Sequence, residues 1–312
     1  MEGPRFGARG ILLAAAFVLA GGCSDPTADV TVGPEPSPTD RVQPPMRIVS
    51  LAPSVTETLF ALGVGERVVG VTRYCDFPAE AAGRAIIGGY LDLNFEAVVG
   101  LEPDLVIGIR DSADAIERLT RLGLATLEVD QRNVAGILHS IATIGEVCAV
   151  GDRAVVLADE VQGRIDEVRR RTAGGQRPRA LVVVDRAAGT GTITAVWAAG
   201  PSSFYDELLE LAGGDNAIEI DFVVYPEVSA EGLLSMDPDV ILEVTAELDN
   251  RGLDQQTLRV DWNSLSTMRA VRSGRVYILD QEYMVIPGPR VARIVEQFAR
   301  ALHPDVDWSD NG

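Results

Sequence analysis

A twelve-residue pattern that occurs twice sets the strongest limit on how this chain folds. Residues 96–107 read Glu-Ala-Val-Val-Gly-Leu-Glu-Pro-Asp-Leu-Val-Ile, and residues 231–242 read Glu-Gly-Leu-Leu-Ser-Met-Asp-Pro-Asp-Val-Ile-Leu. The leading acid, the apolar pair, the acid-Pro-Asp turn and the apolar triplet match at a spacing of 135 residues (231 minus 96). Two copies of one supersecondary unit predict two similar lobes, and a cleft between lobes is where a ligand usually binds.

Short apolar runs alternate with helical patterns around both copies of the motif. The runs that predict strands are residues 47–51, 68–71, 105–109, 125–129, 180–184, 240–244 and 275–279. The patterns that predict helices are residues 55–62, 95–101, 113–122, 134–171, 230–236 and 289–302, and one more that begins at Ser202 or Ser203 and reaches Leu211. Strands that are apolar on both faces and are separated by helices predict an α/β fold with parallel sheets flanked by helices.

Capping patterns mark several helix starts. Ser54 followed by Glu57 reads as a capping box, and Asn94 and Ser229 are good N-caps for the helices of the repeated motif. The long helical stretch breaks near Gly151. We therefore expect one connecting helix, at residues 151–174, between an N-terminal lobe at 46–150 and a C-terminal lobe at 175–305. A single rigid connecting helix predicts limited opening and closing of the cleft.

The N-terminus has the features of an export signal. Arg5 and Arg9 precede a ten-residue apolar run, residues 11–20, that is too short to span a bilayer. Small residues then lead to Cys23, so that residues 1–22 read as a lipoprotein signal peptide and Cys23 as its lipidated product. The alternative is a buried cysteine at the end of a short helix. This pattern places the protein in the cell envelope, in the periplasm or on the outer face of a membrane.

The segment that follows has too little apolar surface to fold. Residues 24–45 contain six prolines among Ser, Thr, Asp and Gly, so residues 23–45 read as a disordered tether. The formal net charge of −19 and the absence of lysine disfavour a nucleic-acid partner. If Cys23 carries lipid, Cys75 and Cys148 remain, and we expect them to be unpaired, mostly buried thiols.

Enzyme motifs are largely missing from the sequence. His139 and His303 are the only histidines, and neither has a partner at metal-ligand spacing. Neither a phosphate-binding loop nor a Gly-x-Ser-x-Gly nucleophile elbow occurs. The sequence therefore does not predict an enzyme, and we expect no bound metal or cofactor of its own.

Two further segments carry a resemblance to a known family. Residues 47–57 read Arg-Ile-Val-Ser-Leu-Ala-Pro-Ser-Val-Thr-Glu, and residues 70–78 read Gly-Val-Thr-Arg-Tyr-Cys-Asp-Phe-Pro. With them the chain resembles, over about residues 46–303, the bacterial substrate-binding proteins of ABC importers for cobalamin, ferric siderophores and haem. The opening segment is most similar to the cobalamin-binding branch. The resemblance implies a monomeric, lipid-anchored protein that delivers a metal chelate to a permease dimer with its ATPase subunits.

The resemblance also implies a docking role for two glutamates. Family members present one glutamate on each lobe to arginines of the two permease subunits, and the matching residues here are Glu96 and Glu231. Arginine–carboxylate pairs are bidentate and specific, and they guide encounter more than they add affinity. The alternative is local, because an acid at the second position of a helix stabilises the helix dipole by about 0.3–1 kcal/mol.

Ligand contacts are expected at the C-terminal ends of the parallel strands. Aromatic residues make up only 5% of the chain, and five lie at apparent loop positions: Tyr74, Tyr90, Trp197, Tyr225 and Tyr283. Five such rings suit a large flat ligand such as a corrin, although each of them is also suited to packing at a strand end. Arg110 and Arg290 are candidates for binding a ligand carboxylate or phosphate, and the alternative for each is a surface salt bridge.

The identity of the cargo stays open between related ligands. Cobalamin or a related corrinoid is the preferred prediction. Haem requires an axial Tyr or His, and a ferric siderophore favours a cleft rich in arginine. From other classes, a metallocluster or chelatase-like enzyme on a related two-lobed fold requires clustered Cys or His ligands that the chain lacks, and a sensor domain is a third alternative.

Overall fold

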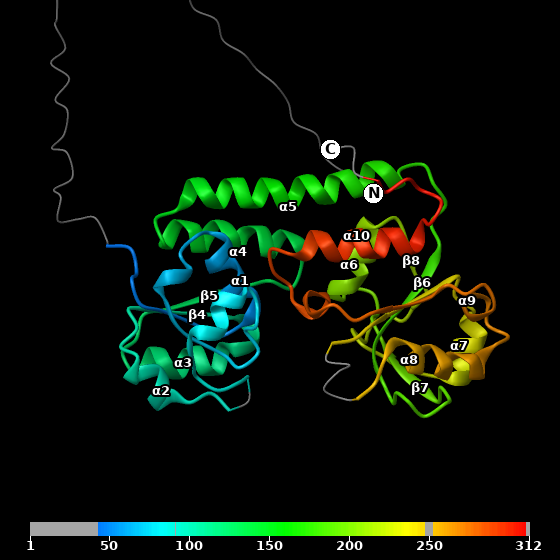
Figure 1. Cartoon of the computed structure of the whole chain (residues 1–312), viewed down its shortest axis with the longest axis horizontal. Coiled ribbons are helices and arrows are strands. Elements are labelled where there is room, and N and C mark those ends of the chain that lie inside the picture. Colours follow the sequence, from blue (N-terminus) through cyan, green and yellow to red (C-terminus); the bar gives the residue numbers. More distant parts are fainter. Residues whose placement is uncertain (1–42, 91, 247–251, 310–312) are drawn as a thin grey trace, which may run out of the picture. The chain divides into compact units, whose positions relative to one another are not determined.

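Two β-sheets, one for each copy of the repeated motif, organise the part of the chain that the structure describes (Figure 1). The structure is a computed structural model and describes residues 43–90, 92–246 and 252–309. The predicted signal peptide, Cys23 and residues 24–42 of the predicted tether lie outside these residues. We refer to residues 43–150 as the first half and to residues 173–309 as the second half.

The sheet of the first half is wholly parallel. Its strand order is β3-β2-β1-β4-β5. The strands are β1 (Ile48–Ser50), β2 (Val68–Val71), β3 (Ala85–Ile86), β4 (Leu105–Ile109) and β5 (Thr126–Val129). The helices are α1 (Pro53–Ala61), α2 (Phe95–Gly100), α3 (Ala113–Arg121) and α4 (Val134–Val147).

Alternation along these strands explains the two helical layers. Ile48 and Ile107 are buried in the core that contains α1 and α4, whereas Val49 and Val106 are buried against α2 and α3. Successive side chains of a strand point to opposite faces. Each strand therefore needs apolar residues at every position, as the sequence pattern predicted.

The sheet of the second half is mixed. Its order is β11-β10-β6-β7-β9, with β8 paired to β6. The strands are β6 (Arg179–Arg186), β7 (Ala195–Ala198), β8 (Asp215–Asn216), β9 (Glu227–Ser229), β10 (Val240–Val244) and β11 (Val276–Leu279). The helices are α6 (Phe204–Leu211), α7 (Ala230–Met236), α8 (Gln255–Trp262), α9 (Arg269–Arg272) and α10 (Val291–Leu302). Short 3-10 helices in the two halves include η2 (Gly65–Arg67), η3 (Ala79–Gly83), η4 (Arg110–Ser112), η6 (Asn263–Leu265) and η7 (Glu282–Val285).

The prediction of parallel sheets is therefore correct for the first half and incomplete for the second. Strand β7 runs antiparallel to both β6 and β9. Gly189 and Gly191, with φ of 73° and 75°, lie in the segment between β6 and β7. Their positive φ values allow tight turns, so the chain returns directly as a hairpin without a crossover helix.

The caps of the repeated motif are confirmed, and the cap of α1 is not. Asn94 Oδ1 accepts from the Ala97 amide at 3.0 Å, and Ser229 Oγ accepts from the Gly232 amide at 3.2 Å. Helix α1 instead begins at Pro53, without a side-chain cap. Proline is well suited to the first helical position because its missing N–H is not needed there. The predicted capping box of Ser54 and Glu57 is wrong.

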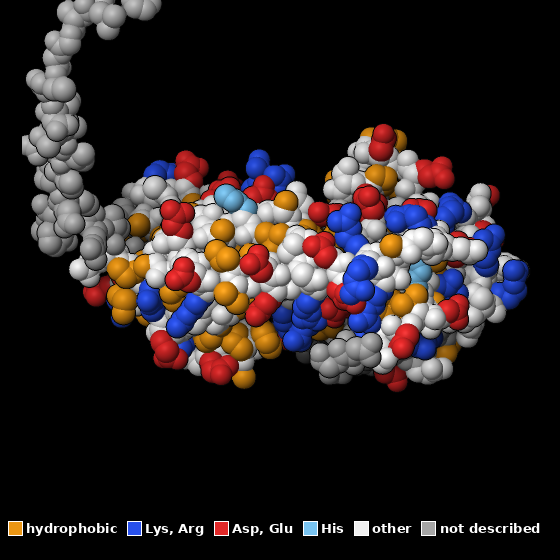
Figure 2. Space-filling view, turned by 90° about the horizontal axis from the view of Figure 1, so that it is seen from above, with side chains coloured by type: hydrophobic (Ala, Val, Ile, Leu, Met, Phe, Trp, Pro, Cys, Tyr) orange, Lys and Arg blue, Asp and Glu red, His pale blue; other side chains and the backbone are white. Residues whose placement is uncertain are grey.

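One long helix, α5 (Gly151–Thr172), lies between the two halves in the chain and packs on α4 and α10 (Figure 1). The largest apolar core is continuous through it, from Ile107 through Ile165 to Val182. Figure 2 looks onto the face with α5 and α10, where arginine and acidic side chains are interspersed. On this face Arg164 donates to Glu296 at 2.8 and 2.7 Å, which joins α5 to α10. None of the helices in the described ranges is long and apolar enough to cross a membrane.

Candidate functional site

Both sheets have a point at which the direction of the strand order reverses. In the first sheet, β1 leads to β2 on one side and β4 leads to β5 on the other. In the second sheet, β6 leads to β7 on one side and β10 leads to β11 on the other. Ligands of open α/β sheets bind in the crevice at the carboxyl ends of such strands. The residues that follow these strands are therefore the candidates for ligand contact.

Two tyrosines form a stacked pair at the carboxyl edge of the first sheet. Tyr74 follows β2 and Tyr90 follows β3, and their rings lie 5.5 Å apart with an interplanar angle of 17°. The two residues are 42% and 48% exposed. The structure thus brings together two of the predicted ligand-binding residues, and it leaves aromatic surface open to a further flat group.

Two glycines allow Tyr90 to lie over Tyr74. Gly88 has a φ of 104°, and a Cβ there would lie 2.3 Å from the Asp92 carbonyl oxygen. A Cβ on Gly89 would lie 2.8 Å from Asp92 Oδ1 and 3.1 Å from Tyr74 Cε2. The turn is also held by Arg73, whose Nη2 donates to Asp92 Oδ2 at 2.5 Å. The Gly-Gly pair is therefore required for the close approach of this turn to the aromatic pair.

Asp111 acts electrostatically on a tyrosine of each half. Burial raises the pKa of Tyr90 to about 12, and the charge of Asp111 contributes to the rise. Burial also raises the pKa of Tyr225, and Asp111 adds to this effect. Tyr225 belongs to the second half and is 38% exposed. Both tyrosines therefore lie within electrostatic range of Asp111.

Sequence reasoning missed Asp111. It is exposed and lies in η4, directly after Arg110 at the end of β4. The strand-end rule that selected Arg110 applies equally to its neighbour. Arg110 is also exposed, and its side chain makes no hydrogen bond or ion pair with another described residue.

Opposite charges are balanced along this edge. Arg73 pairs with Asp92, and Arg132 Nη2 pairs with Asp130 Oδ2 at 2.5 Å. The hydrogen bond from Arg132 lowers the pKa of Asp130 to about 2. With Arg110 and Asp111 added, three arginines face at least three carboxylates. The edge therefore offers no large excess of positive charge to an anionic ligand.

Arg290 lies at the junction of the two halves. Its Nε and Nη2 donate to Glu57 at 2.9 and 2.6 Å, and its Nη1 donates to Glu282 at 2.8 Å. Its guanidinium also lies 3.9 Å from the ring centre of Phe77 and 5.3 Å from that of Tyr283. Arg290 is only 9% exposed. The structure thus commits Arg290 to carboxylates of the protein rather than to a ligand, and it places Tyr283 beside that junction.

Trp197 lies on strand β7, not in a loop as predicted from the sequence. It is 45% exposed, and its strand partners are Asp185 on β6 and Glu227 on β9. The side chain of the neighbouring Val196 points to the opposite face of the sheet and is buried there, as strand alternation requires. Strand β7 therefore includes Trp197, whose side chain lies on the face opposite to that of Val196.

The two motif glutamates are available for contact with another molecule. Glu96 lies in the first turn of α2 and Glu231 in the first turn of α7. Both are exposed, and neither makes a hydrogen bond or ion pair with another described residue. Figure 1 shows α2 and α7 on the same side of the two sheets, away from α5.

The cysteines and histidines form no metal site among the described residues. Cys75 and Cys148 are free and buried, as the sequence predicted. The Cys75 thiol lies 3.2 Å from both Thr56 Oγ1 and Thr72 Oγ1, and burial raises its pKa. A protonated, buried thiol of this kind is a packing group rather than a reactive one.

Comparisons with known proteins agree with this architecture. Residues 48–283 match a family described as periplasmic binding protein. The ABC transporter substrate-binding lipoprotein YvrC of Bacillus subtilis is 28% identical, over 89% of this chain and 83% of its own length. A cobalamin-binding protein of Halobacterium salinarum is also 28% identical, over 83% of this chain and 70% of its own length.

Solved structures of binding proteins are also similar to this one. The vitamin B12-binding protein BtuF of Vibrio cholerae superimposes with a TM-score of 0.71 at 25% identity, covering 84% of this chain and 98% of BtuF. The haem-binding protein BhuT, solved with two haems, gives a TM-score of 0.72 at 26% identity, covering 83% of this chain and 98% of BhuT.

Proposed function

The chain belongs to the periplasmic binding protein family, and we propose that its cargo is cobalamin or a related corrinoid. It is a substrate-binding protein of an ABC transporter, of the group that takes up vitamin B12, haem and ferric siderophores, and it is a transport component rather than an enzyme. The observation that carries the corrinoid proposal is the half-exposed, stacked pair of Tyr74 and Tyr90.

A corrin ring fits the chemistry of this edge. Its plane stacks on the exposed face of the tyrosine pair, while Tyr225 contacts it from the second half. Tyrosine rings supply apolar area together with a hydroxyl for the amides at the ring periphery. The balanced charges of Arg73, Arg132 and their carboxylate partners suit a ligand whose periphery is mainly amide. An anionic ferric siderophore would favour several unpaired arginines, whereas Arg73 and Arg132 at this edge are already paired and leave Arg110 as the available one among the described residues.

Haem is the second candidate, because the similar protein BhuT binds it. Haem iron requires an axial ligand from the protein, usually a deprotonated tyrosine or a histidine. The raised pKa of Tyr90, about 12, disfavours its phenolate form. The histidines lie on α4 (His139) and after α10 (His303), away from the strand ends at the cleft. A corrinoid that carries its own axial ligands does not depend on such a residue.

Delivery is proposed to use the two motif glutamates. Glu96 and Glu231 would each pair with an arginine of one permease subunit. The placement of their helices, α2 and α7, on the side away from α5 suits a two-fold symmetric partner. Attachment through a lipid on Cys23 and the tether of residues 23–45 would keep the monomeric protein near the permease. The lipoprotein YvrC, with its similarity over 89% of this chain, supports that arrangement.

Uptake of labelled cyanocobalamin, measured together with binding, tests the proposal. The Glu96→Ala/Glu231→Ala variant should bind cyanocobalamin like the wild type and should lose most permease-dependent uptake. The matched control is Glu128→Ala/Glu210→Ala, which removes one exposed, unpaired acid from each half. Equal uptake by the two double variants would overturn the docking role, and absence of uptake by the wild type would overturn the corrinoid assignment.

A further inference from the structure

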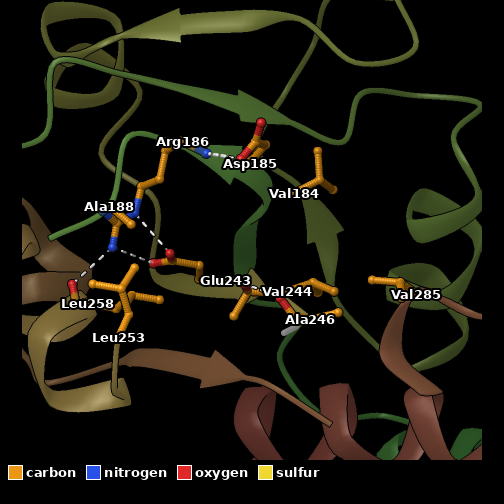
Figure 3. A pocket seen from close by; sticks show the side chains of 11 residues that line it. Val184, Asp185, Arg186, Ala188, Glu243, Val244, Ala246, Leu253, Leu258 and Val285 are labelled. Atoms are coloured by element: carbon orange, nitrogen blue, oxygen red, sulfur yellow. Dashed lines mark hydrogen bonds and ion pairs between the residues drawn. The ribbon is translucent and has the colours of Figure 1, made fainter. Parts of the chain in front are cut away.

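A cavity of about 370 Å³ lies at the carboxyl edge of the second sheet (Figure 3). It is formed between the ends of β6 and β10, the two strands that flank the reversal of strand order. Apolar walls come from Val184, Ala188, Val244, Ala246, Leu258 and Val285. A cavity of this volume is at the small end of the range for ligand sites, so it is sized for one ring-bearing arm rather than a whole macrocycle.

The polar groups below the walls are already satisfied. Arg186 donates to Glu243 at 2.9 and 3.2 Å and to Asp261 at 2.7 Å, and all three side chains are at least 95% buried. Trp262 Nε1 also donates to Glu243 Oε2 at 2.7 Å. A buried arginine with both carboxylates in place is rigid, and it has little capacity left for a ligand anion.

The carboxylate of Asp185 lies at the rim and has room for further hydrogen bonds. Asp185 is exposed, and its Oδ1 accepts from the Arg186 amide at 2.9 Å. Asp185 makes no ion pair with another described residue. Its carboxylate can therefore accept hydrogen bonds from ligand hydroxyl or N–H groups.

The cavity also borders the junction of the two halves. Val285 belongs to η7, the same short helix as Glu282 and Tyr283, which both contact Arg290. Arg290 in turn holds Glu57 of the first half. One substituent of a ligand held between the two halves could therefore enter this cavity.

We propose that the cavity receives the nucleoside-like arm of a corrinoid, which is the aromatic base and sugar that project from the plane of the macrocycle. This inference rests on the proposed function. The apolar walls take the base, and Asp185 accepts from a sugar hydroxyl. The paired state of Arg186 excludes recognition of a propionate or phosphate at this point. The cavity then discriminates corrinoids with a base from base-free corrinoids and from haem.

The test compares cyanocobalamin with dicyanocobinamide, which lacks the base and the sugar. Ala188→Leu and Ala246→Leu fill the cavity from two different walls, and Ala135→Leu, on the exposed surface of α4, is the matched control. Each filled variant should bind cyanocobalamin about tenfold more weakly or worse, since the added leucine side chain occupies volume that the base needs. Binding of dicyanocobinamide should stay within about twofold of the wild type, which also shows that the variants are folded.

Three results would overturn this inference. The first is unchanged cyanocobalamin affinity in both filled variants, and the second is an equal loss for both ligands. The third is a wild-type protein that binds the two corrinoids equally well. In these three cases corrinoid binding itself, and therefore the proposed function, still stands. A wild-type protein that binds neither corrinoid contradicts the proposed function, and the inference fails with it.

Discussion

Arg290 and Glu57, separated by 233 residues of sequence, form a buried bidentate ion pair that joins the two halves. Burial raises the pKa of Glu57, and the hydrogen bonds and charge of Arg290 oppose that rise. The pair adds a polar link to the apolar core that is continuous through α5. Together they favour small adjustments of the cleft over wide opening.

Replacing one member of the Arg290–Glu57 pair should lower the stability of the folded protein. Arg290→Met leaves Glu57 buried without its partner, and we expect the free energy of unfolding to fall by about 3–5 kcal/mol. Urea denaturation measures the loss. The Arg290→Met/Glu57→Met variant should recover most of it, because neither charge is then left unpaired.

The control for this prediction is a surface pair. Arg121 and Glu117 lie 3.8 Å apart and are 70% and 71% exposed, so Arg121→Met should cost no more than about 0.5 kcal/mol. If the two single arginine variants lose similar stability, Arg290 and Glu57 do not form the junction described here.

The phenol of Tyr90 should ionise at a higher pH than an ordinary tyrosine. Its pKa of about 12 compares with an ordinary value of 10, so the phenol stays neutral in the folded protein while it ionises in the unfolded chain. The contribution of Tyr90 to stability is thus fully present below pH 10 and is lost as the pH rises from 10 to 12. The difference in phenolate absorbance between wild type and Tyr90→Phe isolates this titration. Asp111→Asn should shift the midpoint to lower pH, and an unchanged midpoint would contradict the influence of Asp111 on Tyr90. A midpoint near 10 in the protein that carries Asp111 would contradict the burial of the Tyr90 phenol.

Gly89→Ala should disturb the aromatic pair more than the fold. The new Cβ would meet Tyr74 Cε2 at 3.1 Å and Asp92 Oδ1 at 2.8 Å, so the turn that carries Tyr90 must move. We expect cyanocobalamin affinity to fall about tenfold, with a stability loss of about 1 kcal/mol. Gly163→Ala on α5 is the control, since nothing lies within 4 Å of its Cβ, and it should be neutral or stabilising. Unchanged affinity in Gly89→Ala would argue against a ligand on this pair.

Substitutions should distinguish the contribution of the tyrosine rings to ligand binding from the contribution of their hydroxyl groups. Tyr90→Ala and Tyr225→Ala should each weaken cyanocobalamin binding about tenfold, because each removes a ring that the corrin plane covers. Tyr90→Phe keeps the ring and should lose less than about threefold. Equal losses in Tyr90→Ala and Tyr90→Phe would assign the contact to the hydroxyl rather than to stacking.

Elements with strong local signals were predictable from the sequence. Strands β4 and β10 each open with an apolar triplet directly after a Pro-Asp turn, and Asn94 and Ser229 cap the helices before them. Strands β7 and β9 were missed because their pairing is antiparallel and depends on a hairpin turn, which periodicity does not report. Ser54 failed as a cap because its hydroxyl is used elsewhere, in a hydrogen bond of 2.5 Å to Gln131.

The candidate site was predictable where it follows strand ends. Tyr74, Tyr90 and Arg110 lie at the carboxyl edge of the first sheet, as that rule requires. The position of Arg290 was not predictable, because its partner Glu57 lies on a distant helix and no local pattern links the two. The cavity between β6 and β10 was not predictable either, since it depends on how the two strands pair.

Equilibrium titration of the wild-type protein with cyanocobalamin, haemin and a ferric hydroxamate siderophore tests the cargo most directly. We expect one cyanocobalamin to bind per chain, with a dissociation constant at least about tenfold lower than that of either other ligand. Tight binding of haemin with no measurable binding of cyanocobalamin would contradict the account.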